Sequence, residues 1–149
     1  MKTDKWDLKF IELARHISGW SKDKNTKVGA ILVNDSNRII STGYNGFVIG
    51  CDDSIESRYE KNYKLFYTEH AERNCIYAAA EMGNSTRNST MYIILYPCAD
   101  CSRAIIQAGV KRVVCENKPD FNNERWGKSW KISEELFNEC NVQVKFINK

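Results

Sequence analysis

The sequence predicts an α/β protein in three layers, α-β-α, with a mixed five-stranded sheet between its helices. Five short segments rich in β-branched and aromatic residues alternate with longer segments whose apolar residues recur at helical spacing. The first two strand-like segments follow one another directly, whereas each later one follows a helix. A hairpin joined to strand-helix-strand units needs antiparallel and parallel neighbours in one sheet, with helices on both faces.

Length and composition predict one globular domain over residues 1–149, with 42% hydrophobic and 28% charged residues. The formal net charge of +3 suits small anions and gives little support to a nucleic-acid surface. No apolar run is long enough to span a membrane, and Met1 to Asp4 lead into no signal-peptide core. We therefore expect a cytoplasmic protein, or one in the host cytoplasm if it is viral. Its six cysteines are then expected to be thiols or metal ligands.

The first half of the chain is predicted to form a helix and then a hairpin. Residues 6–19 carry an apolar stripe at helical spacing, and Gly19 ends the helix. Residues 28–33 form a continuous apolar run that suits a strand buried on both faces. Residues 38–44 return as its partner after a turn. The polar connection 50–67 shows no clear pattern, and at this length it indicates a functional or interface-forming segment.

The second half is predicted to alternate helices and strands. A helix opens at His70, capped by Thr68, and a strand follows over 90–95. A second helix opens just after Pro97, a residue favoured in the first helical turn, and a strand follows over 110–116. Ser129 or Ser133 is expected to cap a last helix that runs through Cys140, before a part-exposed strand over 142–146.

Two helix starts carry a predicted metal site, His70-Ala71-Glu72 and Pro97-Cys98-Ala99-Asp100-Cys101. One histidine and two cysteines suit Zn²⁺, and a closed structural site would normally have a fourth protein ligand. Three ligands leave a position for water, and Glu72 is placed to move protons beside it. This H-x-E and P-C-x-x-C combination is typical of zinc-dependent base deaminases. A coincidence of motifs or a structural zinc site is the alternative.

Asn45 is a candidate for substrate binding from its chemistry alone. Tyr44-Asn45-Gly46-Phe47 leaves the predicted hairpin, and a glycine after asparagine permits backbone close to a ligand. The Asn45 amide can both donate and accept hydrogen bonds, as a sugar hydroxyl requires. A simple turn explains the same residues equally well.

The chain resembles the deoxycytidylate (dCMP) deaminase family of the cytidine deaminase superfamily along nearly its full length. The first metal motif is common to the superfamily, and the stretches at Tyr44 and at Ile105 are those of the nucleotide branch. The tRNA adenosine deaminases more often have methionine where this chain has Asp100. The resemblance is carried by Ser21-Lys22-Asp23, Thr26-Lys27-Val28-Gly29-Ala30, Gly43-Tyr44-Asn45-Gly46-Phe47, His70-Ala71-Glu72-Arg73-Asn74, Pro97-Cys98-Ala99-Asp100-Cys101 and Ile105-Ile106-Gln107-Ala108-Gly109.

The resemblance implies a cytidine-deaminase-like fold and hydrolysis of dCMP to dUMP with release of ammonia, which supplies dUMP for thymidylate synthesis. It implies one catalytic Zn²⁺ per chain, with Glu72 moving the proton. Of the four other cysteines, Cys75, Cys115 and Cys140 are expected to be small core residues. Residues that the resemblance assigns to the metal are His70, Cys98 and Cys101, and those it suggests for the sugar are Asn45 first, then Thr26 and Asn25.

The phosphate partner stays open among four basic residues, Lys22, Lys24, Arg125 and Lys128. The resemblance further implies a homohexamer that dCTP activates and dTTP inhibits through the region of Tyr44 and Gly46. Here the chain departs from the family, which usually has proline and then a polar or basic residue where this sequence has Val48-Ile49. The departure removes a polar group where an effector phosphate would dock, so regulation stays open.

Three other functions fit the same motifs. The same chemistry could act on a polynucleotide, either tRNA adenosine or single-stranded DNA cytosine. Free cytidine or dCTP could be the substrate, or the domain could be a zinc-stabilised binding module without catalysis. A polynucleotide would use an aromatic and basic platform made of Phe121, Arg125, Trp126, Lys128, Trp130 and Lys131.

Overall fold

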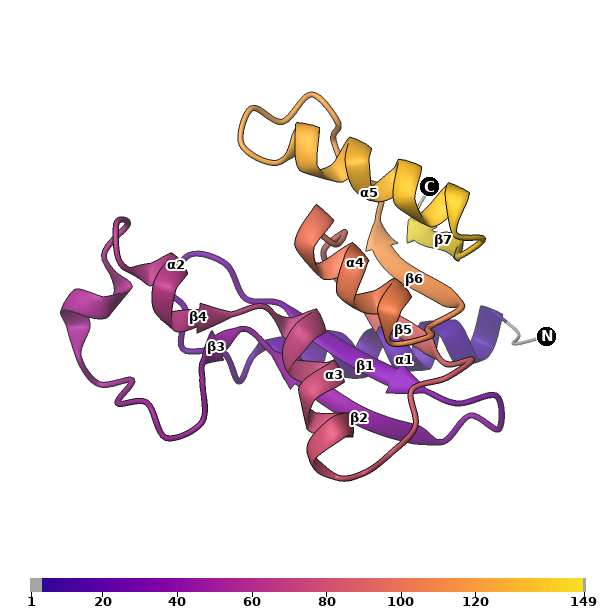
Figure 1. Ribbon diagram of the computed structural model, residues 1–149, viewed down its shortest axis with the longest axis horizontal. Helices are drawn as coiled ribbons and strands as arrows, with labels where there is room; N and C mark the ends of the chain where they lie inside the picture. Colours follow the sequence, from indigo (N-terminus) through magenta and orange to yellow (C-terminus); the bar gives the residue numbers. More distant parts are fainter. Residues whose placement is uncertain (1–3, 149) are drawn as a thin grey trace.

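A mixed five-stranded sheet with strand order β2-β1-β5-β6-β7 forms the centre of the computed structural model, which describes residues 4–148 (Figure 1). The pairs β2-β1 and β1-β5 are antiparallel, whereas β5-β6 and β6-β7 are parallel. The predicted mixed sheet of five strands is therefore confirmed. The strands are β1 (Gly29–Val33), β2 (Ile39–Tyr44), β5 (Thr90–Ile93), β6 (Arg112–Asn117) and β7 (Gln143–Asn148).

Helices cover both faces of this sheet, as predicted. One face carries α1, whose apolar side packs on Ile31, Val33, Tyr92 and Val114. The other face carries α3, α4 and α5, packed on Ala30, Leu32, Met91 and Val113 (Figure 1). Alternate residues of β1 thus face opposite layers, and every residue of this strand is buried. The helices are α1 (Asp4–Ser18), α3 (Ala71–Glu81), α4 (Ala99–Gln107) and α5 (Gly127–Glu139).

Two glycines in the hairpin allow helices to approach the sheet backbone. A Cβ at Gly29 would overlap the carbonyl oxygen of Ala14 in α1, and a Cβ at Gly43 would overlap the backbone nitrogen of Cys75 in α3. Gly43 pairs with Ala30 in the register, next to the pair of Gly29 and Tyr44. The close contact at Gly43 sets the position of α3, and with it the position of His70 at its start.

The connection between β2 and α3 is more structured than the sequence predicted. It contains a short helix η1 (Glu56–Tyr59), a one-turn helix α2 (Lys64–Tyr67) and a second, two-stranded sheet of β3 (Gly46–Phe47) and β4 (Thr68–Glu69). The two strands of this sheet have two residues each and lie far apart in sequence, so they leave no periodic pattern. Their pairing closes the connection into a loop beside the start of α3 (Figure 1).

The predicted helix caps were partly wrong. Thr68 belongs to β4, and His70 itself is the residue that precedes α3, without a capping hydrogen bond from its side chain. Cys98 likewise directly precedes α4. Pro97 therefore lies before the cap residue instead of in the first helical turn, where it was expected. Neither Ser129 nor Ser133 caps α5, which begins after Trp126. None of the helices in residues 4–148 is long and apolar enough to cross a membrane.

Candidate active site and metal centre

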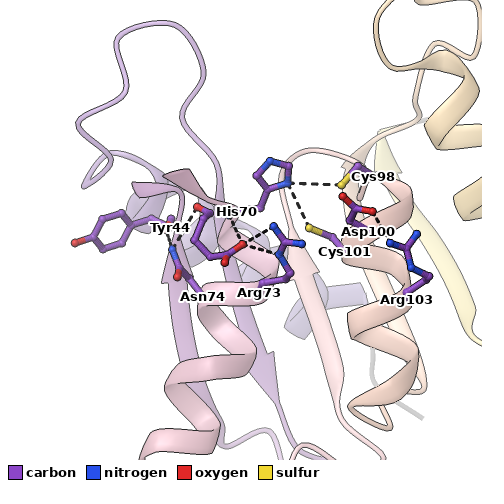
Figure 2. Close-up of polar contacts among 9 residues, drawn as sticks. Tyr44, His70, Arg73, Asn74, Cys98, Asp100, Cys101 and Arg103 are labelled. Carbon is purple, nitrogen blue, oxygen red and sulfur yellow. Dashed lines mark hydrogen bonds and ion pairs between the residues drawn. The ribbon is translucent and has the colours of Figure 1, made fainter. Parts of the chain in front are cut away.

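His70, Cys98 and Cys101 come together between the starts of α3 and α4 (Figure 2). The Nδ1 atom of His70 lies 3.6 Å from Sγ of Cys98 and 3.4 Å from Sγ of Cys101. A tetrahedral zinc with its usual bond lengths to nitrogen and sulfur would hold such atoms about 3.5 Å apart. Within residues 4–148, no other group of three His, Cys, Asp or Glu side chains is placed to hold a metal ion. The geometry fits zinc with three protein ligands.

The start of α4 also favours the thiolate form of Cys98. Cys98 precedes the first residue of α4 and Cys101 lies in its first turn, where the unpaired N–H groups create a positive potential. Hydrogen bonds from Cys101 and His70 lower the pKa of Cys98 well below the usual value for a thiol. A thiolate is the form that binds metal.

The other cysteines differ from this pair. Burial raises the pKa of Cys75 and of Cys115 to about 12, so both are protonated thiols in the core, as predicted. Cys140 was predicted to be a core residue as well, but it is exposed at the end of α5. Cys51 accepts a hydrogen bond from Arg58 and lies away from the metal cluster.

Glu72 lies in the first turn of α3, and only 5% of its surface is exposed. Burial raises the pKa of this carboxyl group to about 7. Glu72 lines the same cavity as His70 and Cys98 without being part of the metal cluster. A carboxyl group that titrates near neutrality can accept and return a proton at little cost, which is what a general acid and base requires.

The three residues predicted to bind the sugar all line this cavity. They are Asn45, Thr26 and Asn25. The side chain of Asn45 is committed in part to the fold, because its Oδ1 accepts from the Val28 N–H at 2.8 Å and its Nδ2 donates to the Thr26 carbonyl at 2.8 Å. One N–H of the Asn45 amide and one lone pair are left over for a ligand. Asn45 therefore shapes the loop that carries the other two residues.

Basic residues near the cavity are only partly those that the sequence suggested. Arg125 lines the cavity, whereas Lys22 pairs with Asp53 and Lys24 lies near Glu56. Lys128 is not among the lining residues. The structure adds Lys64, which lines the cavity from α2 and forms an ion pair with the buried carboxylate of Asp23. The sequence carries no signal for Lys64, because a helix of a single turn leaves no periodic pattern.

The side chains of Trp126 and Trp130 form another wall of the cavity that Glu72 and His70 line. The rings of Trp126 and Trp130 stack with centroids 6.4 Å apart, and Trp126 stands edge-on to the His70 ring, also at 6.4 Å. The guanidinium of Arg125 lies 5.1 Å from the Trp126 ring. Trp130 is buried, and Phe121 packs against the core. Trp126 and Trp130 thus line one side of a cavity, instead of forming with Phe121 the exposed platform that a polynucleotide would need.

A second cavity adjoins the first. Tyr44 and Gly46, the residues suggested for effectors, line it together with Trp20, Lys22, Phe47, Asp53 and Tyr59. Asp23 and Thr68 line both cavities, so a single layer of residues separates them. Val48 and Ile49 do not line this cavity and are exposed by 55% and 95%.

Comparison with known proteins places the chain among the deaminases. The model of the cytidine and deoxycytidylate deaminase zinc-binding region matches residues 4–117. The chain belongs to the deoxycytidylate deaminase family. It is 33% identical over 143 residues to an uncharacterized deaminase of Aliivibrio fischeri, covering 96% of this chain and 94% of that one. It is 38% identical to human deoxycytidylate deaminase over 73% of this chain and 63% of that enzyme. The predicted family is thereby confirmed.

Solved structures give the same result. A crystal structure of dCMP deaminase from the cyanophage S-TIM5, in complex with dCMP and dUMP, superposes with a TM-score of 0.79 at 27% identity. It covers 99% of this chain and 100% of the phage chain. By contrast, this chain spans about three-fifths of the length of the nematode and human enzymes that it matches. The cytidine-deaminase-like fold is confirmed.

Proposed function

We propose that the protein hydrolyses dCMP to dUMP with release of ammonia, and so supplies dUMP for thymidylate synthesis. The observation that carries this proposal is the cavity in which Glu72 lies beside the cluster of His70, Cys98 and Cys101. The cyanophage enzyme, whose structure holds dCMP and dUMP, aligns with 99% of the chain and supports the choice of substrate.

In this proposal His70, Cys98 and Cys101 hold one zinc ion per chain. The bound ion would supply Lewis-acid activation of a water molecule in the open fourth position. Glu72 accepts a proton from the attacking water and delivers it to the ring nitrogen beside the amino-bearing carbon. The water oxygen forms a bond to that carbon. Glu72 then takes the second proton, from the added hydroxyl group, and passes it to the amino group, so that the carbon–nitrogen bond breaks, ammonia leaves and the oxygen becomes a carbonyl oxygen of dUMP. Its pKa of about 7 suits both steps.

Substrate recognition would use both sides of the cavity. Asn45, with Thr26 and Asn25, lies on the side of the hairpin, where hydrogen bonds to the sugar hydroxyl are available. Trp126 offers a flat apolar wall near the metal cluster. Among residues 4–148, Arg125 and Lys64 are the lysine and arginine side chains that line the cavity, and we assign the 5′-phosphate to them.

Regulation would use the second cavity. We propose that dCTP as activator and dTTP as inhibitor bind beside Tyr44 and Gly46 in a homohexamer, with Lys22 as a cation for the triphosphate. Asp23 and Thr68 stand between the two cavities and would carry the effect. Sedimentation with and without each nucleotide, together with rate measurements, tests this part separately from the chemistry.

Two expectations from the sequence are kept as proposals. Residues 1–149 are proposed to unfold as one domain, which a single thermal transition seen by two spectroscopic probes would support. The protein is proposed to act in the cytoplasm, and fractionation of its native cells or infected host cells tests that location. The expectation that Met1 to Asp4 lead into no signal-peptide core falls mostly on residues 1–3. These residues and residue 149 lie outside the described residues.

The substrate is tested by measuring ammonia release from dCMP, cytidine, dCTP, a tRNA and a single-stranded DNA oligomer under the same conditions. A kcat/KM for dCMP well above that for every other compound is expected. If the tRNA or the DNA oligomer is deaminated and none of the three monomers is, the same chemistry acts on a polynucleotide instead. The burial of Trp130 within the cavity wall favours the monomer.

A further inference from the structure

Helix α5 makes side-chain hydrogen bonds to three residues around Cys98. Trp130 donates from Nε1 to the carbonyl oxygen of Tyr96 at 2.9 Å. Ser133 donates from Oγ to the carbonyl oxygen of Pro97 at 2.8 Å, and the same hydroxyl lies 3.1 Å from the Ser129 carbonyl in its own helix. Ser129 accepts at Oγ from the backbone N–H of Ala99 at 2.8 Å.

These bonds fix the backbone on both sides of Cys98. The carbonyl oxygen of Cys98 itself accepts from the Ser102 N–H inside α4, at 2.9 Å. Pro97 has no N–H, so its carbonyl is its one backbone group for hydrogen bonding. The Ala99 N–H belongs to the first turn of α4 and has no partner in its own helix. Ser133 and Ser129 therefore satisfy groups that the metal-binding segment cannot satisfy alone.

Cys101 needs no such support, because it is the third residue of α4 and the helix itself fixes its backbone conformation. Cys98 stands at the junction of loop and helix, where rotation of one peptide unit would move its sulfur relative to His70. A hydroxyl on each side of the junction opposes that rotation. Ser133 is fully buried, so water offers no substitute partner for the Pro97 carbonyl there.

We infer that Ser129 and Ser133 are positioning residues for Cys98 and that they set the zinc affinity of the site. Residues that orient metal ligands typically change metal affinity by about 10- to 100-fold when they are replaced. Both serines lie outside residues 4–117, the part of the chain that the zinc-binding family model matches. The inference rests on the proposed zinc site of His70, Cys98 and Cys101.

The test compares zinc dissociation constants, measured by chelator competition at fixed pH on the full chain, for wild type, Ser129→Ala and Ser133→Ala. Each alanine variant is expected to bind zinc about 10- to 100-fold more weakly than wild type. Ser129→Thr keeps the hydroxyl and is expected to restore most of the affinity. In the cobalt-substituted protein, the sulfur-to-cobalt charge-transfer band is expected to shift in both alanine variants.

Ser89→Ala is the matched control. Ser89 is also buried, and its hydroxyl donates to the Thr86 carbonyl at 2.6 Å, but it precedes β5 at the end of the sheet far from the metal cluster. Its loss is expected to lower the melting temperature without changing zinc affinity or the cobalt spectrum. An equal loss of zinc affinity in this control would mean that general destabilisation is the cause, and would overturn the inference.

Unchanged zinc affinity in both Ser129→Ala and Ser133→Ala would overturn the positioning role while leaving the proposed metal site intact. A wild-type protein that binds no zinc would overturn the proposed metal site and the inference together. The two failures are thus distinguished by the wild-type measurement alone.

Discussion

The two helix starts that carry His70, Cys98 and Cys101 are held in different ways. The start of α3 is held by close backbone packing, because the absence of a side chain at Gly43 lets Ala71 and Cys75 of α3 lie directly against β2. The start of α4 is held by hydroxyl groups from α5, which lie on either side of Cys98. Added side-chain volume at Gly43 should therefore displace His70, whereas loss of the Ser129 or Ser133 hydroxyl should displace Cys98.

The largest effect on activity is expected from the α3 side. Glu72→Gln removes the carboxylate that accepts the proton and keeps the size of the side chain. No residue of α4 lines the cavity to take over the proton transfer. We expect kcat for dCMP to fall by about 10²- to 10⁴-fold while zinc content stays that of wild type. Ammonia release and metal analysis on the same samples check this. A variant that keeps both its zinc and its rate would exclude Glu72 from the chemistry.

Gly43→Ala is expected to cause the largest loss of stability. The added methyl group meets the backbone of α3, which cannot rotate away, so we expect a loss of about 3 kcal/mol in urea unfolding and weaker zinc binding through displaced His70. Gly46→Ala is the control, since its methyl group would meet only the Tyr44 ring at 3.7 Å. Equal stability of the two variants would show that α3 does not depend on the contact at Gly43.

Asp7 of α1 forms ion pairs with Arg112 and Lys145 on the sheet, and these pairs predict how stability changes in acid. Burial alone would raise the pKa of Asp7, but hydrogen bonds from Arg112, Lys145 and Tyr92 outweigh it and lower the pKa to about 2, from 3.8. A lowered folded-state pKa contributes stability that is fully present above pH 3.8 and is lost as the pH falls through about 2. The contribution is about 2 kcal/mol.

Urea unfolding of wild type and Asp7→Asn between pH 2 and pH 7 measures that contribution. The variant is expected to be less stable at pH 7, and its stability should change less between pH 4 and pH 2 than that of wild type. Parallel curves for the two proteins over this range would mean that Asp7 titrates alike in the folded and unfolded states.

The smallest effects concern the phosphate, for which each side of the site offers one cation. Arg125 precedes α5 and Lys64 lies in α2, near the start of α3. Arg125→Ala and Lys64→Gln are each expected to lower kcat/KM for dCMP by about tenfold, or about 1.4 kcal/mol, and to leave the value for deoxycytidine nearly unchanged. Lys24→Ala is the control, because Lys24 is exposed and does not line the cavity. Equal losses on both substrates would assign these residues a structural role.

The proximity of His70, Cys98 and Cys101 could be predicted from the sequence because its signals are local. Cys98 and Cys101 sit three residues apart at a helix start, and Glu72 follows His70 by two, so short motifs contain most of the geometry. The fold followed from periodicity, including the hairpin of β1 and β2. What failed depends on partners distant in the chain. Lys64 forms an ion pair with Asp23, which lies far from it in sequence, and the one-turn helix that carries Lys64 is too short to show a periodic pattern.

The wrong assignments of Ser129 and Ser133 have the same origin. A serine near the start of an apolar helix is a good candidate to cap it, and the sequence cannot show that another helix supplies a better partner. Here the free N–H at the start of α4 lies within reach of Ser129, and the Pro97 carbonyl lies within reach of Ser133. Local preference was overruled by packing between α4 and α5.

The central claim, a zinc-dependent hydrolysis of dCMP, is tested most directly by following dUMP formation through removal and return of the metal. We predict that chelation reduces the rate to background and that activity returns in proportion to zinc, reaching its maximum at one ion per chain. A chelated protein that is free of metal and keeps its rate, or a zinc-loaded protein that forms no dUMP, would contradict the account.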